Sequence, residues 1–568
     1  MKYWQHLISV PGRLRSNRFR FGFTFVLIAC AVLILRDCLR SPGALIPSTP
    51  GLSSTVPLLN AWTIVHNSDS LHDGMLDYWN AGIFSPEEGT FAYSEPQPAT
   101  LIVAPVFWLT GSPALAYNLY LVVSLTLNGW LTFLFLRQVR VRNMMAASAG
   151  LAMTLHPLAL QQRDVLQLVP MWGIIWVWTA AFQLYRCPRR STGIYLGIAA
   201  ATAFFTSVHH GAFMLLATLP AGVVLVPSDM SRRWLKAVTV SVLTFTALVV
   251  PLLWPMYDRL TGMNFSRTPE TVQSLSAMVS DYSVTPSQAL LPVKPPGTRG
   301  WNLNPGYIRC GLASCGIVVV LSGRGRRRTR WTLFLLLMGT VSLLFSLGLN
   351  LQIVGWTPWQ TVSRLVPGFA LVRSPFRFAY FVQMSVILIA AMGLDYLDRL
   401  LRQKVKSPVA RTPFGLLTAA LALLLAFEVP PQRGSVVEVS NLNEPPAWAE
   451  FLRGHSANGG SVLCLPYAAG NSVQDFELTT RWMLLSTEFG LPIVNGYSGF
   501  FPQSHFDFQK ELSIDAFSEA SIEMMRRSDV RYVVLHLKIM DREQVVPEGL
   551  FTPVFHDSGS VIVYELIP

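Results

Sequence analysis

Residues 55–100 read TVPLLNAWTIVHNSDSLHDGMLDYWNAGIFSPEEGTFAYSEPQPAT and form the only long polar segment in the first half of the chain. Apolar runs of membrane-spanning length lie before and after this segment. It contains a large share of the 32 acidic residues of the chain, namely Asp69, Asp73, Asp77, Glu87, Glu88 and Glu95. We interpret it as a loop on the outer side of a membrane that covers a cavity, and we expect any chemistry to take place beneath it.

The composition indicates a polytopic membrane protein. Charged residues make up 13% and hydrophobic residues 51% of the 568 residues, whereas a soluble chain usually carries about 25% charged residues. The net charge of +12 does not indicate nucleic-acid binding, because Lys and Arg fall in short clusters between apolar runs, as in the positive-inside pattern. The six cysteines show no zinc or redox spacing.

Apolar segments alternate with basic clusters along most of the chain. The eleven segments are 21–35, 114–136, 144–160, 168–185, 193–208, 212–226, 237–254, 307–321, 331–347, 378–397 and 414–427. If the basic residues 1–20 stay in the cytoplasm, every basic cluster falls on that side. We therefore predict an all-α membrane domain over 21–429 in a bacterial inner membrane, with the N-terminus cytoplasmic. Outer loops are expected at about 37–112, 255–306 and 348–377.

Two details of this topology concern the first apolar segments. Arg36 and Asp37 follow the first segment without a small-residue cleavage site, so we expect a retained signal anchor rather than a cleaved signal peptide. Residues 101–109 are apolar but too short to cross a bilayer, which favours a re-entrant or interfacial helix.

The composition changes to a mixed, globular pattern from Glu428 onward. Residues 430–568 are predicted to form a small extracytoplasmic α/β domain with a modest core of its own. Strands are expected at 461–466, 531–536 and 560–566, and helices at 476–488 and 518–527.

Several acids of the 55–100 segment are candidates for a general base or a metal ligand. Asp69, Asp73 and Asp77 recur every four residues, which on a helix would place them along one face. Three carboxylates on one face favour a nearby cation, so a divalent metal is possible, although no cofactor is required by the pattern. A solvated amphipathic helix explains the same spacing.

Basic residues in the outer loops are candidates for substrate binding. Arg364, Arg373 and Arg377 lie on the side where the positive-inside pattern disfavours them, and guanidinium groups recognise phosphate with fork geometry. The alternative is pairing with loop acids or lipid headgroups. His209 and His210 lie at the outer end of an apolar segment and could hold a metal or a phosphate, or could be an ordinary interface pair.

Three stretches carry a resemblance to a known superfamily. They are PLLNAW (57–62) with NAGIF (80–84) and AYSE (92–95), then PVFWLTGSPALAYN (105–118), and finally RSPFRF (373–378). NGYSG (495–499) and VRYVVLH (530–536) also fit. With the order of spans and loops, these stretches resemble the GT-C superfamily of polytopic glycosyltransferases, and more narrowly the bacterial group related to protein mannosyltransferases and lipid A sugar transferases.

The resemblance implies transfer of a sugar from a polyprenyl-phosphate donor on the outer face, with an early loop Asp as the base for the acceptor. This chain departs from the group's pattern at three places. Thr55-Val56 stands where the group has Gly-Asp, and Pro96 stands where it often has His. The group's Gly-His-Leu-Gln reads DVLQ (164–167), while Glu95, Gln167, Arg373 and Arg377 remain.

Our first hypothesis is therefore a membrane glycosyltransferase with an extracytoplasmic glycan, lipid or protein acceptor. Its catalytic acid would be Asp73, Asp69 or Glu95, with Asp73 preferred. The expected substrate-binding residues are Arg373, Arg377, Arg364, Gln167, His209 and His210.

The second hypothesis is an inactive relative that binds or handles lipid-linked glycans. The missing Gly-Asp favours this hypothesis. An ion-coupled transporter is disfavoured, because the apolar segments hold very few acids at mid-membrane depth.

Overall fold

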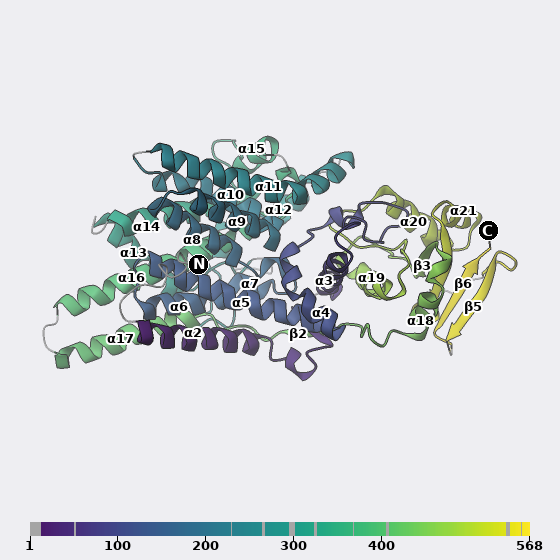
Figure 1. Ribbon diagram of the computed structural model, residues 1–568, viewed down its shortest axis with the longest axis horizontal. Helices are drawn as coiled ribbons and strands as arrows, with labels where there is room; N and C mark the ends of the chain where they lie inside the picture. The colour runs from purple at the N-terminus through teal and green to yellow at the C-terminus, as the bar shows by residue number, and fades with distance from the viewer. Residues whose placement is uncertain are drawn as a thin grey trace.

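The computed structural model describes residues 13–49, 53–228, 230–263, 267–294, 301–322, 326–366, 368–404, 408–540, 546–557 and 559–567. The molecule is elongated, with a helical bundle at one end and a mixed α/β part at the other (Figure 1). The long helices of the bundle are α2 (Arg13–Ile34), α5 (Pro113–Gln138), α6 (Asn143–Thr154), α8 (Trp172–Arg186), α9 (Arg190–Thr206), α10 (Val208–Gly222), α11 (Arg232–Gly262), α13 (Tyr307–Leu321), α14 (Arg326–Ser346), α16 (Ala379–Lys404) and α17 (Pro408–Phe427).

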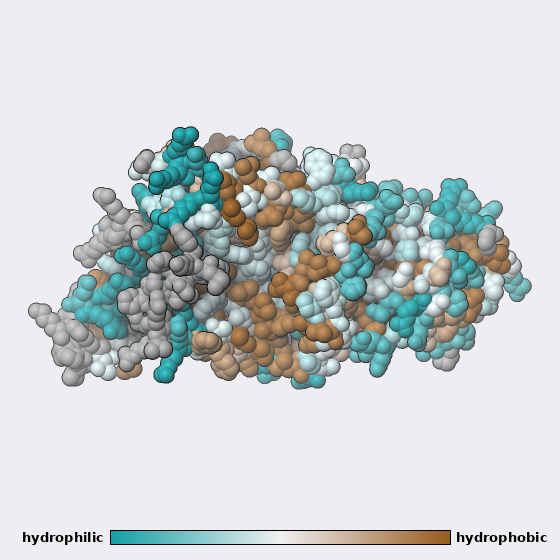
Figure 2. Space-filling model, in the orientation of Figure 1, coloured by the Kyte–Doolittle hydropathy of each residue, from teal (hydrophilic) through white to brown (hydrophobic). Residues whose placement is uncertain are grey.

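Each of the eleven predicted apolar segments overlaps one of these helices. Among the described residues, seven helical stretches are long and apolar enough to cross a membrane by length and composition. They are Asn17–Ile34, Pro113–Gln138, Leu166–Arg186, Val208–Leu225, Arg232–Gly262, Thr329–Ser346 and Pro375–Gln403. Figure 2 shows an apolar zone over the middle of the molecule, with hydrophilic residues toward both ends.

An ion-pair network ties helix ends together on the side of the bundle away from the α/β part. Arg142, at the start of α6, pairs with the buried Asp395 of α16 at 2.9 Å and also contacts Asp398. Arg399 and Arg402 pair with the same two acids, at 3.0 and 2.9 Å. Because each buried carboxylate has a basic partner, the network compensates the cost of burying charge.

The 55–100 segment, predicted as an outer loop, begins with a buried helix. Helix α3 (Thr55–His72) buries eleven of its residues and packs against α19 (Glu477–Phe489). The prediction that Asp69, Asp73 and Asp77 share one helix face is wrong. The helix ends at His72, with Asp73 as its C-cap, because the chain turns at Gly74, whose φ of +74° favours glycine.

After α3 the chain runs through turns toward the bundle. It forms 3₁₀ turns at Thr90–Tyr93 and Pro98–Val103, and then helix α4 (Ala104–Thr110) before α5. A short helical element over residues 101–109 is therefore confirmed. It ends before α5 because Gly111 caps α4 in a left-handed conformation and Pro113 starts the next helix. Three further short helices lie between the long helices of the bundle. They are α7 (Pro157–Gln161), α12 (Pro269–Ser274) and α15 (Pro358–Leu365).

The α/β part is built on a four-stranded sheet in the order β3-β4-β6-β5. Strands β3 and β4 run parallel, whereas β6 is antiparallel to both of its neighbours. The strands are β3 (Ser461–Leu465), β4 (Val530–His536), β5 (Phe551–Asp557) and β6 (Val561–Leu566), and the accompanying helices are α18 (Ala447–Gly454), α19, α20 (Gln503–Ile514) and α21 (Glu519–Arg527).

The α/β part packs against the adjacent end of the helical bundle. Strand β1 (Leu45–Ser48) pairs antiparallel with β2 (Ser435–Glu438), so the start of the chain is hydrogen-bonded to the segment after α17. One hydrophobic core contains Trp62 of α3, Tyr117 of α5 and Met483 of α19. Only a smaller core around β3, β4, α20 and α21 belongs to the α/β part by itself.

A close contact fixes the 82–85 segment on the α/β part. The Phe84 N–H donates to the Asn495 carbonyl at 3.3 Å, and the Ile493 N–H donates to the Gly82 carbonyl at 2.8 Å. The Phe84 ring lies so close to Gly496 that a Cβ there would be 2.5 Å from a ring carbon. Only glycine therefore allows this approach.

Replacing Gly496 with leucine should lower the melting temperature of the protein. The added side chain would overlap the Phe84 ring, and overpacking of this kind costs about 1–3 kcal/mol. Thermal unfolding in lipid nanodiscs measures the effect. Gly454→Leu is the matched control, because a Cβ at Gly454 meets no atom within 4 Å. Equal melting temperatures for the two variants would contradict this account of the contact.

A second prediction concerns Asp69, which is half-buried and faces Glu488 of α19. Burial and the charge of Glu488 raise the pKa of Asp69 to about 6. An unfolded Asp titrates near about 3.9, so the folded state binds the proton more tightly between these values and the free energy of unfolding falls as pH rises through them. Asp69→Asn should therefore stabilise the protein at pH 7 and have little effect at pH 4.

Chemical unfolding at the two pH values measures this difference. Glu548→Gln, at an exposed position, is the control and should leave stability unchanged at both. A loss of stability in Asp69→Asn at pH 7 would show that the Asp69 carboxylate is held as an ion by a favourable partner.

Candidate functional site

Three arginines from two loops gather where the bundle meets the α/β part. Arg267 follows α11, Arg373 precedes the 3₁₀ turn Pro375–Phe378, and Arg377 lies in that turn. The charge of Arg373 acts on both of the other guanidinium groups. Burial, with Arg373 nearby, lowers the pKa of Arg267 to about 10. We call these three residues the arginine cluster.

Arg267 is held in place by the α/β part. Its Nη2 donates to the Gly499 carbonyl at 3.0 Å, and its Nε donates to the Leu371 carbonyl at 3.5 Å. Its guanidinium lies over the Phe500 ring, 4.8 Å from the centroid. The 495–501 loop therefore positions one of the three cations, and the charge of Arg373 also acts on Tyr497 of the same loop.

The other two arginines keep donors for a further partner. Within the part of the chain that the structure describes, the Arg377 Nε is buried and has no hydrogen-bond partner. The exposed Arg373 guanidinium takes part in no hydrogen bond or ion pair among the same residues. A guanidinium carries five N–H donors and suits planar oxyanions. Three neighbouring cations, of which Arg373 and Arg377 have unused donors, therefore form a site for an anion.

A buried acid and a histidine lie against this cluster. Glu95, which is 7% exposed, accepts the His209 backbone N–H at 3.1 Å and the Ser207 hydroxyl at 3.3 Å. It also contacts the His209 Nδ1. The acid thus sits at the N-terminus of α10, where the helix dipole favours negative charge.

The contact between His209 and Glu95 determines the tautomer of the His209 ring. Because Glu95 accepts from Nδ1, the Nε2 atom carries the lone pair. The charges of Arg377, Arg373 and Arg267 all act on this ring, so it lies next to the arginine cluster. The Glu95–His209 pair is therefore a base oriented by a carboxylate beside a cationic site.

Helix α3 fixes the segment that carries Glu95. The Asn67 amide donates to the Pro96 carbonyl at 2.7 Å. The Gln97 amide donates to the Asn60 side-chain oxygen at 2.8 Å and lies 3.5 Å from the Gln167 side-chain oxygen. Asn60 and Asn67 are thus polar residues that are buried on α3 with hydrogen-bond partners. The contact with Gln97 places Gln167 at the edge of the site.

Asp164 is a second buried acid near the cluster. Its side chain accepts the Thr49 hydroxyl at 2.7 Å, and the charge of Arg377 acts on it. Burial raises the pKa of Asp164. The neighbouring Arg163 donates instead to the Ser48 and Gln432 carbonyls, at 3.3 and 3.1 Å.

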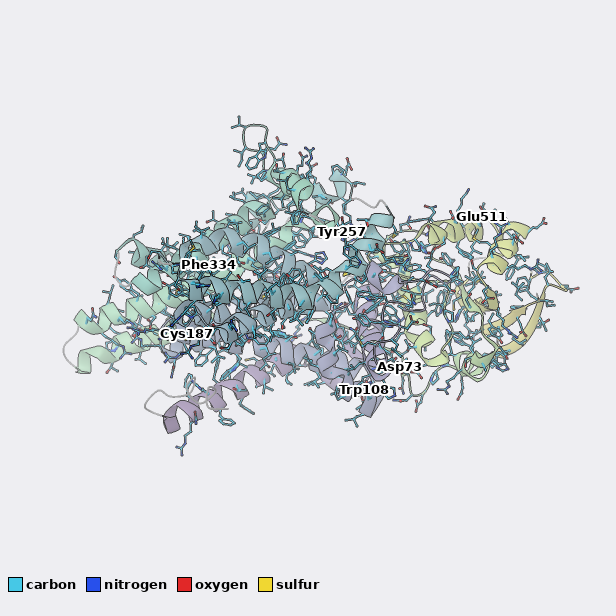
Figure 3. The ribbon with its side chains drawn as sticks, turned by 45° about the horizontal axis from the view of Figure 1, so that its top comes forward. Asp73, Trp108, Cys187, Tyr257, Phe334 and Glu511 are labelled. Carbon is cyan, nitrogen blue, oxygen red and sulfur yellow. The ribbon has the colours of Figure 1, made fainter. Side chains whose placement is uncertain are left out.

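The structure separates Asp69, Asp73 and Arg364 from this group. Asp69 faces Glu488, and the exposed Asp73 lies near Trp108 at the molecular surface (Figure 3). Arg364, in α15, is exposed and is not among the charges that act on His209 or Arg377. His210 is buried next to His209, with its Nδ1 3.4 Å from the Pro170 carbonyl, and the charge of Arg377 also acts on it, so it lies at the edge of the site.

Of the nine predicted residues, Glu95, Arg373, Arg377 and His209 come together, with Gln167 and His210 adjacent. Sequence reasoning missed Arg267, although it too is a basic residue in a predicted outer loop, which is the signal that singled out Arg373 and Arg377. The described residues contain no group of three or more His, Cys, Asp or Glu side chains placed to hold a metal ion.

Comparison with known proteins shows the fold. No protein-family model and no curated protein matches the chain. Among solved structures it is similar to the arabinofuranosyltransferase AftD from Mycobacteria, with a TM-score of 0.52 and 14% identity over 96% of this chain and 41% of AftD. The chain thus spans about two fifths of the length of AftD.

The archaeal oligosaccharyltransferase AglB from Archaeoglobus fulgidus, in complex with an inhibitory peptide and a dolichol-phosphate, gives a TM-score of 0.45 and 12% identity over 93% of this chain and 70% of AglB. Their names describe AftD as an arabinofuranosyltransferase and AglB as an oligosaccharyltransferase. The fold resemblance that the sequence implied is therefore confirmed, with AftD as the structure that supports it.

Proposed function

We propose that this protein is a membrane glycosyltransferase that moves a sugar from a polyprenyl-phosphate donor to a hydroxyl group of an acceptor. The observation that carries the proposal is the arginine cluster, in which Arg373 and Arg377 have unused donors, beside the Glu95–His209 pair. The likeness in fold to AftD, whose name describes a sugar transferase, agrees with it.

The arginine cluster would bind the phosphate of the donor. When the bond between the sugar carbon and the phosphate oxygen breaks, the electron pair leaves with the lipid phosphate and negative charge grows on it. Fixed guanidinium groups in a partly dry site stabilise such developing charge strongly. Arg267 and Arg377 are partly buried beside Arg373, so they are preorganised for this task.

The Glu95–His209 pair would activate the acceptor. As the acceptor oxygen forms a bond to the sugar carbon, its proton passes to the His209 Nε2. The Glu95 carboxylate holds the ring in the right tautomer and stabilises the imidazolium that forms. This role falls to Glu95 and His209 rather than to Asp73 or Asp69, which lie elsewhere.

We place the site on the extracytoplasmic side. The ion-pair network of Arg142, Arg399 and Arg402 lies at the opposite end of the bundle from the α/β part, and basic residues favour the cytoplasmic side. The N-terminus would then be cytoplasmic and the α/β part extracytoplasmic.

A second candidate is a protein that binds lipid-linked glycans without transferring sugar. At the position where the sequence lacks the group's Gly-Asp, Thr55 starts helix α3 and its hydroxyl donates to the Val473 carbonyl at 2.6 Å. That position therefore supplies no acid, and the arginine cluster alone would suffice for binding.

Substitutions at the site should separate binding from chemistry. Arg373→Ala should weaken donor binding, whereas His209→Gln should reduce kcat by about 10²–10⁴-fold with little change in donor affinity. The assay is sugar transfer in proteoliposomes from a panel of polyprenyl-phosphate sugars, with donor binding measured in parallel. Arg364→Ala and Asp73→Asn are the controls and should retain full activity.

Wild-type protein that binds a donor but transfers to no acceptor would support the second candidate. Full transfer by His209→Gln would remove the pair from the mechanism.

The two members of the pair should act as a unit. Glu95→Gln should reduce kcat because the ring loses its carboxylate, and the double variant Glu95→Gln/His209→Gln should be no worse than the more damaged single variant. A double-mutant cycle on kcat measures this. Additive losses would indicate that Glu95 acts independently of His209.

A further inference from the structure

A cavity of about 690 Å³ lies between α11 and residues 75–98, which is within the size range of small-molecule sites. Its floor and sides are largely apolar and come from Phe205, Leu252 and Pro255. Tyr78, Trp79 and Trp254 add aromatic surfaces.

The charged lining of this cavity differs in sign from the arginine cluster. Asp77, Glu88 and Asp258 contribute three carboxylates, and Arg259 contributes one guanidinium. An excess of carboxylates repels a phosphate group. Carboxylates accept hydrogen bonds from hydroxyl groups, and aromatic faces offer flat apolar surface. This combination suits an uncharged molecule with many hydroxyl groups.

The walls of the cavity are fixed by local contacts. The Asn80 amide donates to the Asp77 carboxylate at 2.6 Å, and the Asn80 oxygen accepts the Gly89 N–H at 2.5 Å. The Arg259 guanidinium packs over Gly89, where a Cβ would be 2.6 Å from its Nε. The binding surface is therefore formed before a ligand arrives, which lowers the entropic cost of binding.

One side of the cavity continues into an apolar surface of α11. Leu248 and Trp254 line the cavity, and both remain exposed, Trp254 by 63%. Val250 and Tyr257 are exposed on the same helix, and α11 lies within a stretch that is long and apolar enough to cross a membrane. Figure 3 shows Tyr257 near the end of the bundle that meets the α/β part. A lipid chain can therefore lie along α11 with its headgroup in the cavity.

The cavity also adjoins the segment that carries the proposed catalytic acid. Ala92 and Pro98 line it, and Glu95 lies between them in the sequence. Phe205 lines it as well, and Ser207, two residues later, donates to Glu95. The same short segments thus build the wall of the cavity and the support of the Glu95–His209 pair.

From these observations we infer that the cavity binds the uncharged glycan headgroup of a membrane-anchored glycolipid, which is the acceptor of the reaction. The acceptor role rests on the proposed function, whereas the binding itself is independent of it. The donor phosphate and the acceptor glycan would then occupy two sites of opposite charge. Residues 92–98, which carry Glu95, would contribute to both sites.

Binding in nanodiscs that contain no glycolipid tests the inference. The probes are decyl glycosides of glucose, galactose, mannose and arabinose, with decanol as the chain-only control and farnesyl phosphate as a probe of the arginine cluster. At least one decyl glycoside should bind more tightly than decanol. Trp254→Ala and Asp258→Asn should each weaken that binding by about 10-fold, the loss of about 1.4 kcal/mol, and leave farnesyl phosphate binding unchanged.

Leu423→Ala, at an exposed position of α17 outside the cavity, is the control and should bind both probes as the wild type does. The inference is overturned if no glycoside binds better than decanol, if both cavity variants bind as the wild type does, or if they lose farnesyl phosphate instead. Glycoside binding with the expected losses, in a protein that transfers no sugar, would support the cavity and contradict the proposed function.

Discussion

Like charges held close together in a partly buried place repel one another, and the folded protein keeps Arg267, Arg373 and Arg377 in this arrangement. Glu95 is engaged by His209 and Ser207, and Asp164 accepts a hydrogen bond from the Thr49 hydroxyl, so both acids also serve partners outside the cluster. A fold that holds three guanidinium groups in this way is stabilised by an anion. The proposed phosphate site follows from this constraint.

Much of the remaining structure serves to hold that arrangement. Helix α3 is buried between the bundle and α19, and its Asn60 and Asn67 side chains hold the segment that carries Glu95. The 495–501 loop positions Arg267 through Gly499 and Phe500. The α/β part is therefore a component of the site, which explains why it shares a core with α3 and α5 rather than packing alone.

The sequence predicted the helices of the bundle well, because long apolar runs between basic clusters are a strong and local signal. The strands β3, β4 and β6 were also predicted from β-branched runs, whereas β5, which contains Pro553, was not. The site was harder to predict because it depends on which loops meet. The sequence pattern favoured Asp73 over Glu95, whereas in the structure α3 ends at His72, Asp73 is exposed and Glu95 is buried against His209.

The most direct test is an experimental structure of the protein in nanodiscs with a bound polyprenyl phosphate, determined by electron cryomicroscopy. We predict the phosphate to lie in contact with the guanidinium groups of Arg373 and Arg377, with the Glu95–His209 pair beside it. Phosphate density away from these residues, or guanidinium groups that are separated from one another and paired with carboxylates, would contradict the account.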